Sequence, residues 1–197
     1  MFFLIKFQFN TMLFLIRTFD ICFALVAMII TSPLILFAML ISFYDTKSPF
    51  FYQTRVGKKM QPFTLIKFRT MPIETPSLAS HLICGSSVSK FGYFLRKTKL
   101  DELPQLWNVL KGDMSLVGPR PNLFNQEELI CARDALDVYN VRPGITGLSQ
   151  IKVIDMSTPT LLAKTDAEMI STMSVANYFK YIFLTFAGKG QGDRVRR

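Results

Sequence analysis

Histidine is nearly absent from this chain of 197 residues, and several familiar catalytic motifs are missing altogether. One histidine is too little for a Ser-His-Asp triad to be expected. The sequence contains no Gly-rich phosphate loop of the P-loop or Rossmann kind, and no D-x-D pair of the sort that many nucleotide-sugar glycosyltransferases carry. A phosphate-binding site in this chain would therefore have to be built from cationic side chains and a metal ion.

Cysteine is also scarce, and Cys22, Cys84 and Cys131 stand far apart. An odd number at wide spacing fits neither a disulfide framework nor a zinc pattern, and it suits a reducing cytosolic environment. His81 and Cys84 form an H-x-x-C pair, but no second pair follows. We therefore expect His81 to be a solvated loop residue rather than a metal ligand.

Acidic residues are outnumbered by basic ones, which gives a net charge of +9. The charges of residues 1–45 sum to zero, so the whole excess lies in residues 46–197. A basic region behind an apolar segment suits nucleic acid, the anionic cytoplasmic leaflet or a phosphorylated substrate. The apolar segment favours the last two, and we expect no nucleic-acid partner.

The apolar residues concentrate in one uncharged run of 23 residues, 21–43. At about 1.5 Å per residue, a helix of this length can cross a hydrocarbon core of about 30 Å. Ser32 and Pro33 interrupt the run near its middle, where proline clashes with the carbonyl of Ile29 and the serine hydroxyl is placed to satisfy a freed carbonyl. Composition alone leaves two alternatives, a kinked spanning helix or a re-entrant helix that enters and leaves on one face. Lys6 and Arg17, before the run, are expected to prefer the cytoplasmic side.

Beyond the membrane segment the pattern predicts a small domain that is mostly helical, with short strands. Residues 46–62 are rich in turn formers and read as a loop. Residues 62–71, "PFTLIKFRTM", have strand composition, and the two-residue period places Lys67 and Arg69 on one face. Residues 72–90 read as a connection rich in Ser, Pro and Thr.

The second half of the chain is predicted to be largely helical. Leucines at helical spacing predict a helix that begins near Leu100 or Asp101, with Pro104 in its first turn. A charged helix is predicted over 123–139 and further helix over 160–187, where the aromatic and then basic end suits a membrane surface.

Two adjacent carboxylates, Asp101 and Glu102, stand at the predicted start of the first of these helices. One interpretation is structural, because acidic residues at a helix N-terminus offset the macrodipole by about 0.3 to 1 kcal/mol. The other is catalytic: one carboxylate attacks a phosphorus while the other helps hold a divalent cation. Candidate phosphate ligands are the cations at strand, turn and helix-approach positions, because a planar guanidinium can bond two phosphate oxygens at once. They are Lys67, Arg69, Arg96, Arg120 and Arg142.

Three segments give the sequence a family resemblance. They are "RVGKKMQPFTLIKFRTM", "FLRKTKLDELPQLWNVLKGDMSLVGPRP" and "VRPGITGLSQ", which together with the Ser-Pro break cover most of residues 20–150. The sequence resembles the bacterial sugar transferases that start glycan assembly on a polyprenyl carrier, also called monotopic phosphoglycosyl transferases. It resembles their smallest form.

The resemblance implies that a UDP-sugar gives its phosphosugar to undecaprenyl phosphate and that UMP is released. It implies a covalent phosphosugar intermediate on Asp101, with Glu102 beside it and both carboxylates associated with Mg²⁺. It also implies substrate contacts from Lys67, Arg96, Arg120 and Arg142, whereas Arg69 is a candidate from its strand position alone. A contact from Asp166 is implied as well, although Ala167 and Glu168 replace the aromatics usual after that aspartate.

For the fold, the resemblance implies an α+β protein with a re-entrant membrane segment broken at Ser32 and Pro33. Residues 1–46 would form this segment and residues 47–197 a catalytic domain on the cytoplasmic face of the bacterial inner membrane. Two other functions remain open: a non-enzymatic basic module that recruits partners to anionic lipid, and a membrane glycosyltransferase that releases UDP. Neither the sugar nor the oligomeric state is indicated by the sequence.

Overall fold

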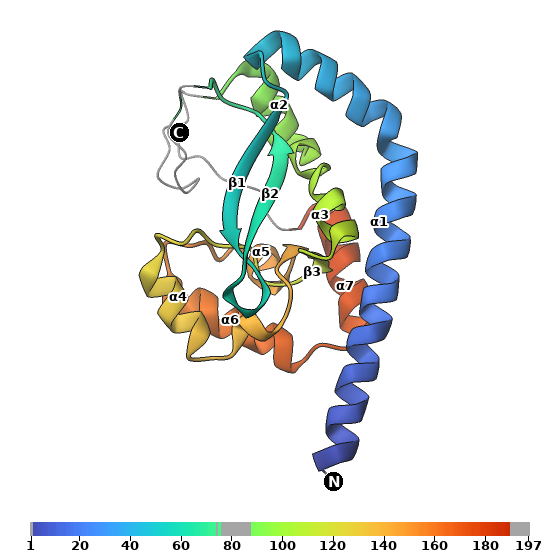
Figure 1. Cartoon of the computed structure of the whole chain (residues 1–197), viewed down its shortest axis with the longest axis vertical. Coiled ribbons are helices and arrows are strands. Elements are labelled where there is room, and N and C mark those ends of the chain that lie inside the picture. The colour runs from blue at the N-terminus through green and yellow to red at the C-terminus, as the bar shows by residue number, and fades with distance from the viewer. Residues whose placement is uncertain (1, 74, 76–87, 190–197) are drawn as a thin grey trace.

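The computed structural model describes residues 2–73, 75 and 88–189, and side chains from residue 11 onward within these ranges. His81 and Cys84 lie outside the described residues. The fold is mixed and mostly helical, with two small sheets and one long apolar N-terminal helix, as the sequence predicts. Figure 1 shows this helix, α1, running along one side of the molecule and bending over one end of it.

Helix α1 spans Phe2–Thr46 and continues through Pro33. Pro33 has no N–H to give to the Ile29 carbonyl, and the Ser32 hydroxyl donates to that carbonyl instead, at 2.8 Å. The expected hydrogen bond of the serine is therefore confirmed. It occurs within a continuous helix, which does not break at Pro33. Thr31 donates to the Ala27 carbonyl in the same way, at 2.7 Å. The most apolar window of α1 is only 11% buried within the structure, which is compatible with membrane association.

A hairpin follows the helix. Strand β1, Phe50–Val56, pairs antiparallel with β2, Pro62–Phe68, across the short 3₁₀ turn η1, Lys58–Met60. The strand expected over 62–71 is confirmed, but the interpretation of residues 46–62 as a loop is wrong, because "FFYQTRV" forms the partner strand. The turn formers that indicated a loop, Pro49, Gly57 and Pro62, only bound the strand.

The middle of the sequence folds into a series of short helices, turns and strands. Helix α2, Lys90–Thr98, is followed by the 3₁₀ turn η4, Leu100–Glu102, and by α3, Gln105–Lys111. Strand β3, Ser115–Val117, then pairs parallel with β4, Gly144–Thr146. Gly118 and Gly144 lie so close that a Cβ on Gly144 would be 2.0 Å from the Gly118 nitrogen.

The last elements pack at the other end of the hairpin. They are α4, Glu127–Asp134; η5, Val138–Asn140; α5, Leu148–Ile151; α6, Pro159–Ser171; and α7, Val175–Phe186. Helix was predicted over 123–139 and 160–187, and it is found in both ranges. Figure 1 shows α4 and α6 together below the hairpin, with α7 beside α1.

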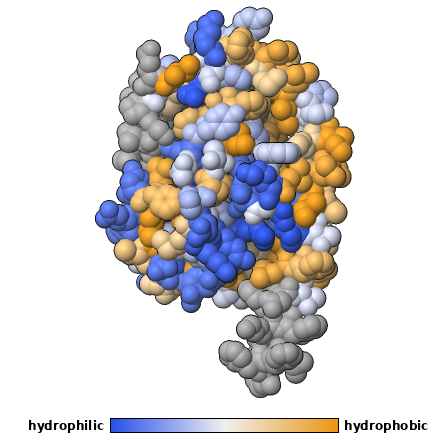
Figure 2. Space-filling view, in the orientation of Figure 1, coloured by the Kyte–Doolittle hydropathy of each residue, from blue (hydrophilic) through white to orange (hydrophobic). Residues whose placement is uncertain are grey.

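Three hydrophobic clusters hold these elements together, and α1 contributes to each of them. Ala24 packs with β2 and α3, Ile16 with β3, α6 and α7, and Ala38 with β2 and α2. Figure 2 shows apolar side chains along the edge that α1 forms and hydrophilic ones over the part of this face that holds α4 and α6. The long helix is therefore apolar on its outer side and part of the core on its inner side.

Candidate functional site: an acidic turn between cations

The acidic pair lies in a tight turn rather than in an α-helix. Lys99 ends α2 in the left-handed conformation, with φ of 58°, and η4 begins at the next residue. Helix α3 begins only at Gln105, with Pro104 as its N-cap, so the expected start near Leu100 is wrong by about one turn. Proline has no N–H to continue the 3₁₀ turn, which explains the new start. Asp101 and Glu102 are both buried, with 5% and 8% of their surface exposed.

Glu102 joins two of the predicted cations. Its Oε1 lies 3.3 Å from Lys67 Nζ and 3.3 Å from Arg120 Nη2. Lys67 comes from β2, and Arg120 follows β3 in the segment stiffened by two prolines. Because the Glu102 and Lys67 side chains are about nine-tenths buried, little water screens their attraction. The structure thus brings Asp101, Glu102, Lys67 and Arg120 to one place.

A small hollow beside this cluster contains a further cation that sequence reasoning missed. Arg55, Lys67, Arg120 and Gln105 provide its polar lining. Arg55 comes from β1 and donates from Nη1 to the Pro121 carbonyl at 3.1 Å, which ties it to the Arg120 segment. Recognising β1 from its aromatic and β-branched residues would have placed Arg55 on a strand and not in a loop.

Asn108 fixes the distance between the acidic turn and β2. This fully buried side chain donates from Nδ2 to the Thr64 carbonyl at 2.7 Å and accepts from the Ile66 N–H at 3.1 Å. The Asn108 amide thereby makes the two hydrogen bonds that a neighbouring strand would make with the backbone of β2. Lys67 is the next residue, so this pairing lies directly beside the residue that contacts Glu102.

Arg69 and Arg96 form a second group around Thr70. Arg96 donates from Nε to Thr70 Oγ1 at 2.8 Å, and the Arg69 guanidinium lies 5.5 Å from the centre of the Phe51 ring. Among the described residues, Arg69 Nε and Arg96 Nη1 are buried and make no hydrogen bond. Buried donors without a partner are an exception in proteins, and these two N–H groups are suited to donate to a bound anion.

Arg142 is placed apart from the acidic turn. Its Nε donates to the Gly112 carbonyl at 2.8 Å, at the C-terminal end of α3, whereas the acidic turn precedes the N-terminal end. Seven residues of helix separate the two ends by about 10 Å. Burial, followed by the charges of Arg142 and Lys59, lowers the pKa of the Lys58 ammonium. Arg142 therefore belongs to a separate cationic group, and the structure does not bring it together with Glu102.

Asp166 is completely buried, in α6, and its partner is Arg133 of α4. Arg133 Nη2 lies 2.6 Å from Asp166 Oδ2, and the Ser149 hydroxyl donates to Asp166 Oδ1 at 2.8 Å. Burial raises the pKa of the Asp166 carboxyl, and Arg133 and Ser149 oppose this shift. The predicted substrate contact of Asp166 stays a prediction.

Arg133 connects this buried pair to the site. Its Nη1 donates to the Arg120 carbonyl at 2.9 Å and to Asn122 Oδ1 at 2.8 Å. Tyr139 donates to the same Asn122 oxygen at 3.1 Å, and burial raises the pKa of its phenol. Arg133 was not predicted, because its sequence context, "ICARD", reads as part of a solvated helix. It holds the backbone from which Arg120 reaches Glu102.

The donor set of the acidic turn suits Mg²⁺ with a phosphate ligand. No group of three or more His, Cys, Asp or Glu side chains that suits a metal occurs among the described residues. Mg²⁺ is commonly held by one or two carboxylates together with substrate phosphates and water, which does not require such a group. The contacts of Glu102 with Lys67 and Arg120 both involve Oε1.

Comparison with known proteins identifies the family of the chain. The family described as "Bacterial sugar transferase" matches residues 11–190. The "Uncharacterized sugar transferase EpsL" of Bacillus subtilis (strain 168) is 46% identical over 136 residues, 68% of this chain and 67% of that protein. The "UDP-glucose:undecaprenyl-phosphate glucose-1-phosphate transferase" of Caulobacter vibrioides is 35% identical over 179 residues, 86% of this chain and 67% of that protein.

A longer relative matches over a smaller part of its own length. The "Undecaprenyl-phosphate galactose phosphotransferase" of Salmonella typhimurium is 38% identical over 156 residues, which is 70% of this chain but 32% of that protein. With the family match over most of its length, the chain is an enzyme of the transferase class. It belongs to the bacterial sugar transferase family, as its motifs predict.

Proposed function

We propose that the protein transfers a phosphosugar from a UDP-sugar to undecaprenyl phosphate and releases UMP. The observation that carries the proposal is the ion-paired Glu102, held between Lys67 and Arg120 with Asp101 as its neighbour. Two relatives bear names that state phosphotransfer onto undecaprenyl phosphate, one for galactose and one for glucose from UDP-glucose. The sugar used by this chain stays open.

The proposed reaction uses Asp101 as a phosphoryl acceptor. One carboxylate oxygen attacks the phosphorus that bears the sugar. The bond from this phosphorus to the bridging oxygen breaks, and UMP leaves with the electron pair. An oxygen of undecaprenyl phosphate then attacks the same phosphorus and displaces the carboxylate, which restores Asp101 and yields undecaprenyl diphosphate sugar.

The cations around the turn reduce the repulsion between a negative nucleophile and two negative substrates. Lys67, Arg120 and Arg55 line one small hollow, and the first two pair with Glu102. In the proposal these three cations bind the diphosphate. Arg69 and Arg96 carry buried donors with no protein acceptor, which supports a second phosphate position there. Arg142 would contact the nucleotide only if the substrate extends along α3.

Asp101 and Glu102 are the residues that would hold Mg²⁺. The ion would supply charge neutralisation on the phosphate oxygens. Glu102 already has two cationic partners, so its part in the proposal is to hold Lys67 and Arg120 beside the nucleophile as well as to face the metal.

We also propose that residues 1–46 form a re-entrant membrane segment and that the remaining residues face the cytoplasm. The two arms of α1 on either side of Pro33 both pack on the same body, through Ala24 in one arm and Ala38 in the other. A helix that crossed the bilayer would carry its second arm away from a domain on the first side. In this proposal the acidic turn lies near the lipid headgroups, at the level of the lipid phosphate.

The test is to incubate the purified full chain in lipid vesicles with undecaprenyl phosphate, Mg²⁺ and a panel of UDP-sugars. We expect UMP to be released with one or a few of the UDP-sugars and not with the others. Release of UDP would instead indicate a glycosyltransferase, and no nucleotide release from any sugar would favour a membrane recruitment module.

The nucleophile is tested by Asp101→Asn, which keeps the size of the side chain. We expect UMP release to fall to background while membrane association and thermal unfolding stay as in the wild type. Substantial residual UMP release would refute Asp101 as the acceptor.

A further inference from the structure

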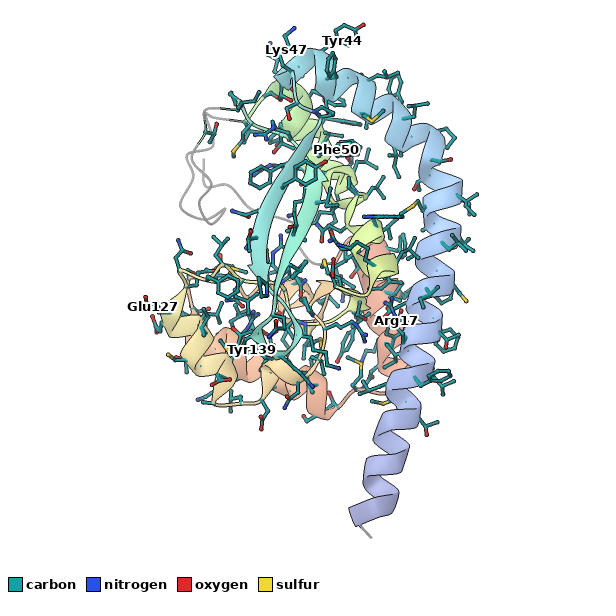
Figure 3. All side chains as sticks on the ribbon, viewed as in Figure 1. Arg17, Tyr44, Lys47, Phe50, Glu127 and Tyr139 are labelled. Atoms are coloured by element: carbon teal, nitrogen blue, oxygen red, sulfur yellow. The ribbon has the colours of Figure 1, made fainter. Side chains whose placement is uncertain are left out.

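Two charged residues of α1 point into the protein instead of toward lipid. Arg17 and Asp20 are the only charged residues between positions 11 and 44, and they lie one turn apart on one helix face. Asp20 is 1% exposed. Figure 3 labels Arg17 on the side of α1 that faces α3 and α7. Charged side chains in an apolar segment are costly, and they commonly have a function.

Arg17 caps the C-terminal end of α3. Its Nη1 donates to the Val109 carbonyl at 2.8 Å, and its Nη2 donates to the Leu110 carbonyl at 3.2 Å. The last carbonyls of a helix have no partner within the helix, and α3 has only seven residues. A helix this short depends on such outside contacts for its position.

Asp20 holds the start of β3. Its Oδ1 accepts from the Leu116 N–H at 2.8 Å and from the Ser115 hydroxyl at 3.0 Å. The Tyr178 hydroxyl of α7 donates to the same oxygen at 2.9 Å. Asp20 thus joins α1 to β3 and to α7 through one atom.

These contacts fix both parts of the acidic site to one turn of α1. Glu102 lies on the turn that leads into α3, and the C-terminal end of α3 is capped by Arg17. Arg120 lies three residues after β3, and the first residues of β3 are hydrogen-bonded to Asp20. The segment between α3 and β3 is therefore attached to the apolar helix by two polar anchors.

We propose that Arg17 and Asp20 are positioning residues that hold the acidic turn at the depth of the lipid phosphate. The inference rests on the proposed function, because it assigns the acceptor to a membrane lipid. Asp20 acts as a hydrogen-bond acceptor, so Asp20→Asn, which keeps Oδ1, should preserve the anchor, and Asp20→Ala should remove it.

Trp107 provides a direct measurement of depth. It is the only tryptophan in the chain, it lies in α3 five residues after Glu102, and its side chain is half exposed. Its fluorescence can be quenched by lipids that carry a nitroxide at different positions along the acyl chain. We expect the quenching profile to shift in Arg17→Ala and in Asp20→Ala, and to stay as in the wild type in Asp20→Asn.

The matched control is Thr18→Ala. Thr18 lies on the exposed face of the same helix turn and donates only to the Phe14 carbonyl, within α1. We expect the control to leave both the quenching profile and the kinetics unchanged.

In vesicles, Asp20→Ala should raise the KM for undecaprenyl phosphate by about 10- to 100-fold, the scale of a misplacement of about 1 Å. The KM for the UDP-sugar, which arrives from water, should stay near the wild-type value. An unchanged quenching profile in both alanine variants would overturn the inference, and so would an equal rise in the KM for both substrates. If the wild type released no UMP, the proposed function would fail, whereas the quenching experiment would still test the anchor.

Discussion

Replacing Asp166 should destabilise the protein far more than replacing Glu168, two residues later in the same helix. Both carboxylates form ion pairs with a cation from another element. Asp166 Oδ2 lies 2.6 Å from Arg133 Nη2, and both side chains are almost completely buried. Glu168 Oε2 lies 3.0 Å from Lys152 Nζ, and both of these side chains are about half exposed. The two positions share α6, so burial is the main difference between them.

The magnitudes follow from what each substitution leaves behind. Asp166→Ala leaves the Arg133 guanidinium buried without its carboxylate, a situation that costs about 3 to 5 kcal/mol. Glu168→Ala leaves Lys152 in water, where the pair contributes about 0 to 1 kcal/mol. For a chain of this length, 1 kcal/mol shifts Tm by about 2 to 4 °C, so we expect a fall of about 10 °C for Asp166→Ala and at most about 4 °C for Glu168→Ala.

The assay is thermal unfolding of the purified full chain, followed by circular dichroism in one detergent for all variants. A double variant, Arg133→Met with Asp166→Leu, removes the buried charges together and should recover much of the lost stability. It should not recover activity, because Arg133 also donates to the Arg120 carbonyl and to Asn122. Equal Tm values for the two alanine variants would refute the reasoning, as would full activity in the double variant.

Three further predictions concern the site and the membrane segment. Lys67→Met should lower turnover by about 10²-fold, as expected for loss of one stabilising cation, whereas Lys111→Met, at a more exposed ion pair, should leave UMP release unchanged. Gly118→Ala should cost about 1 to 3 kcal/mol in thermal unfolding, because its Cβ would lie 2.5 Å from a backbone oxygen; an unchanged Tm would contradict this. In a variant whose native cysteines are replaced, Phe2→Cys and Met60→Cys should both escape reagents that label only from outside, and labelling of just one would favour a spanning helix.

The strongest sequence signals concerned local pattern and composition. The apolar run predicted the long helix, and the serine beside Pro33 was expected to satisfy a carbonyl, as it does at Ile29. The alternation in residues 62–71 predicted β2 and placed Lys67 on the same face as Phe63 and Leu65, and all three are buried in the structure. Each of these inferences depends on residues close together in the chain, which is why periodicity could reveal them.

The contacts that were missed join residues far apart in the chain. Arg133 and Asp166 are 33 residues apart, and Arg17 and Val109 are 92 residues apart. No local pattern distinguishes a buried arginine in a charged helix from a solvated one. Strand β1 was missed for a different reason, since the turn formers around it outweighed seven residues of strand composition.

The rule that proline favours the start of a helix predicted α3, but placed its first residue about one turn too early. Proline does stand at the beginning of a helix here, but as its N-cap, and the acidic pair occupies the 3₁₀ turn before it. A macrodipole at the start of α3 therefore lies beyond Pro104 and explains the acidic pair less well than the two ion pairs of Glu102 do. The catalytic interpretation of Asp101 and Glu102 stays a prediction.

The packing of α1 also bears on how the site would meet the proposed lipid substrate. A helix used only as an anchor needs no polar contact with the domain that it carries, because apolar area alone holds it in the bilayer. Helix α1 instead gives one buried and two partly buried residues to each hydrophobic cluster. It also gives two charged side chains to the backbone around α3 and β3. Any tilt or vertical movement of α1 must therefore move Glu102 and Arg120 with it. On this basis the position of the helix in the bilayer should affect the position of the acidic turn. Lipids that change the bilayer thickness should therefore change the KM for undecaprenyl phosphate more than the KM for the UDP-sugar.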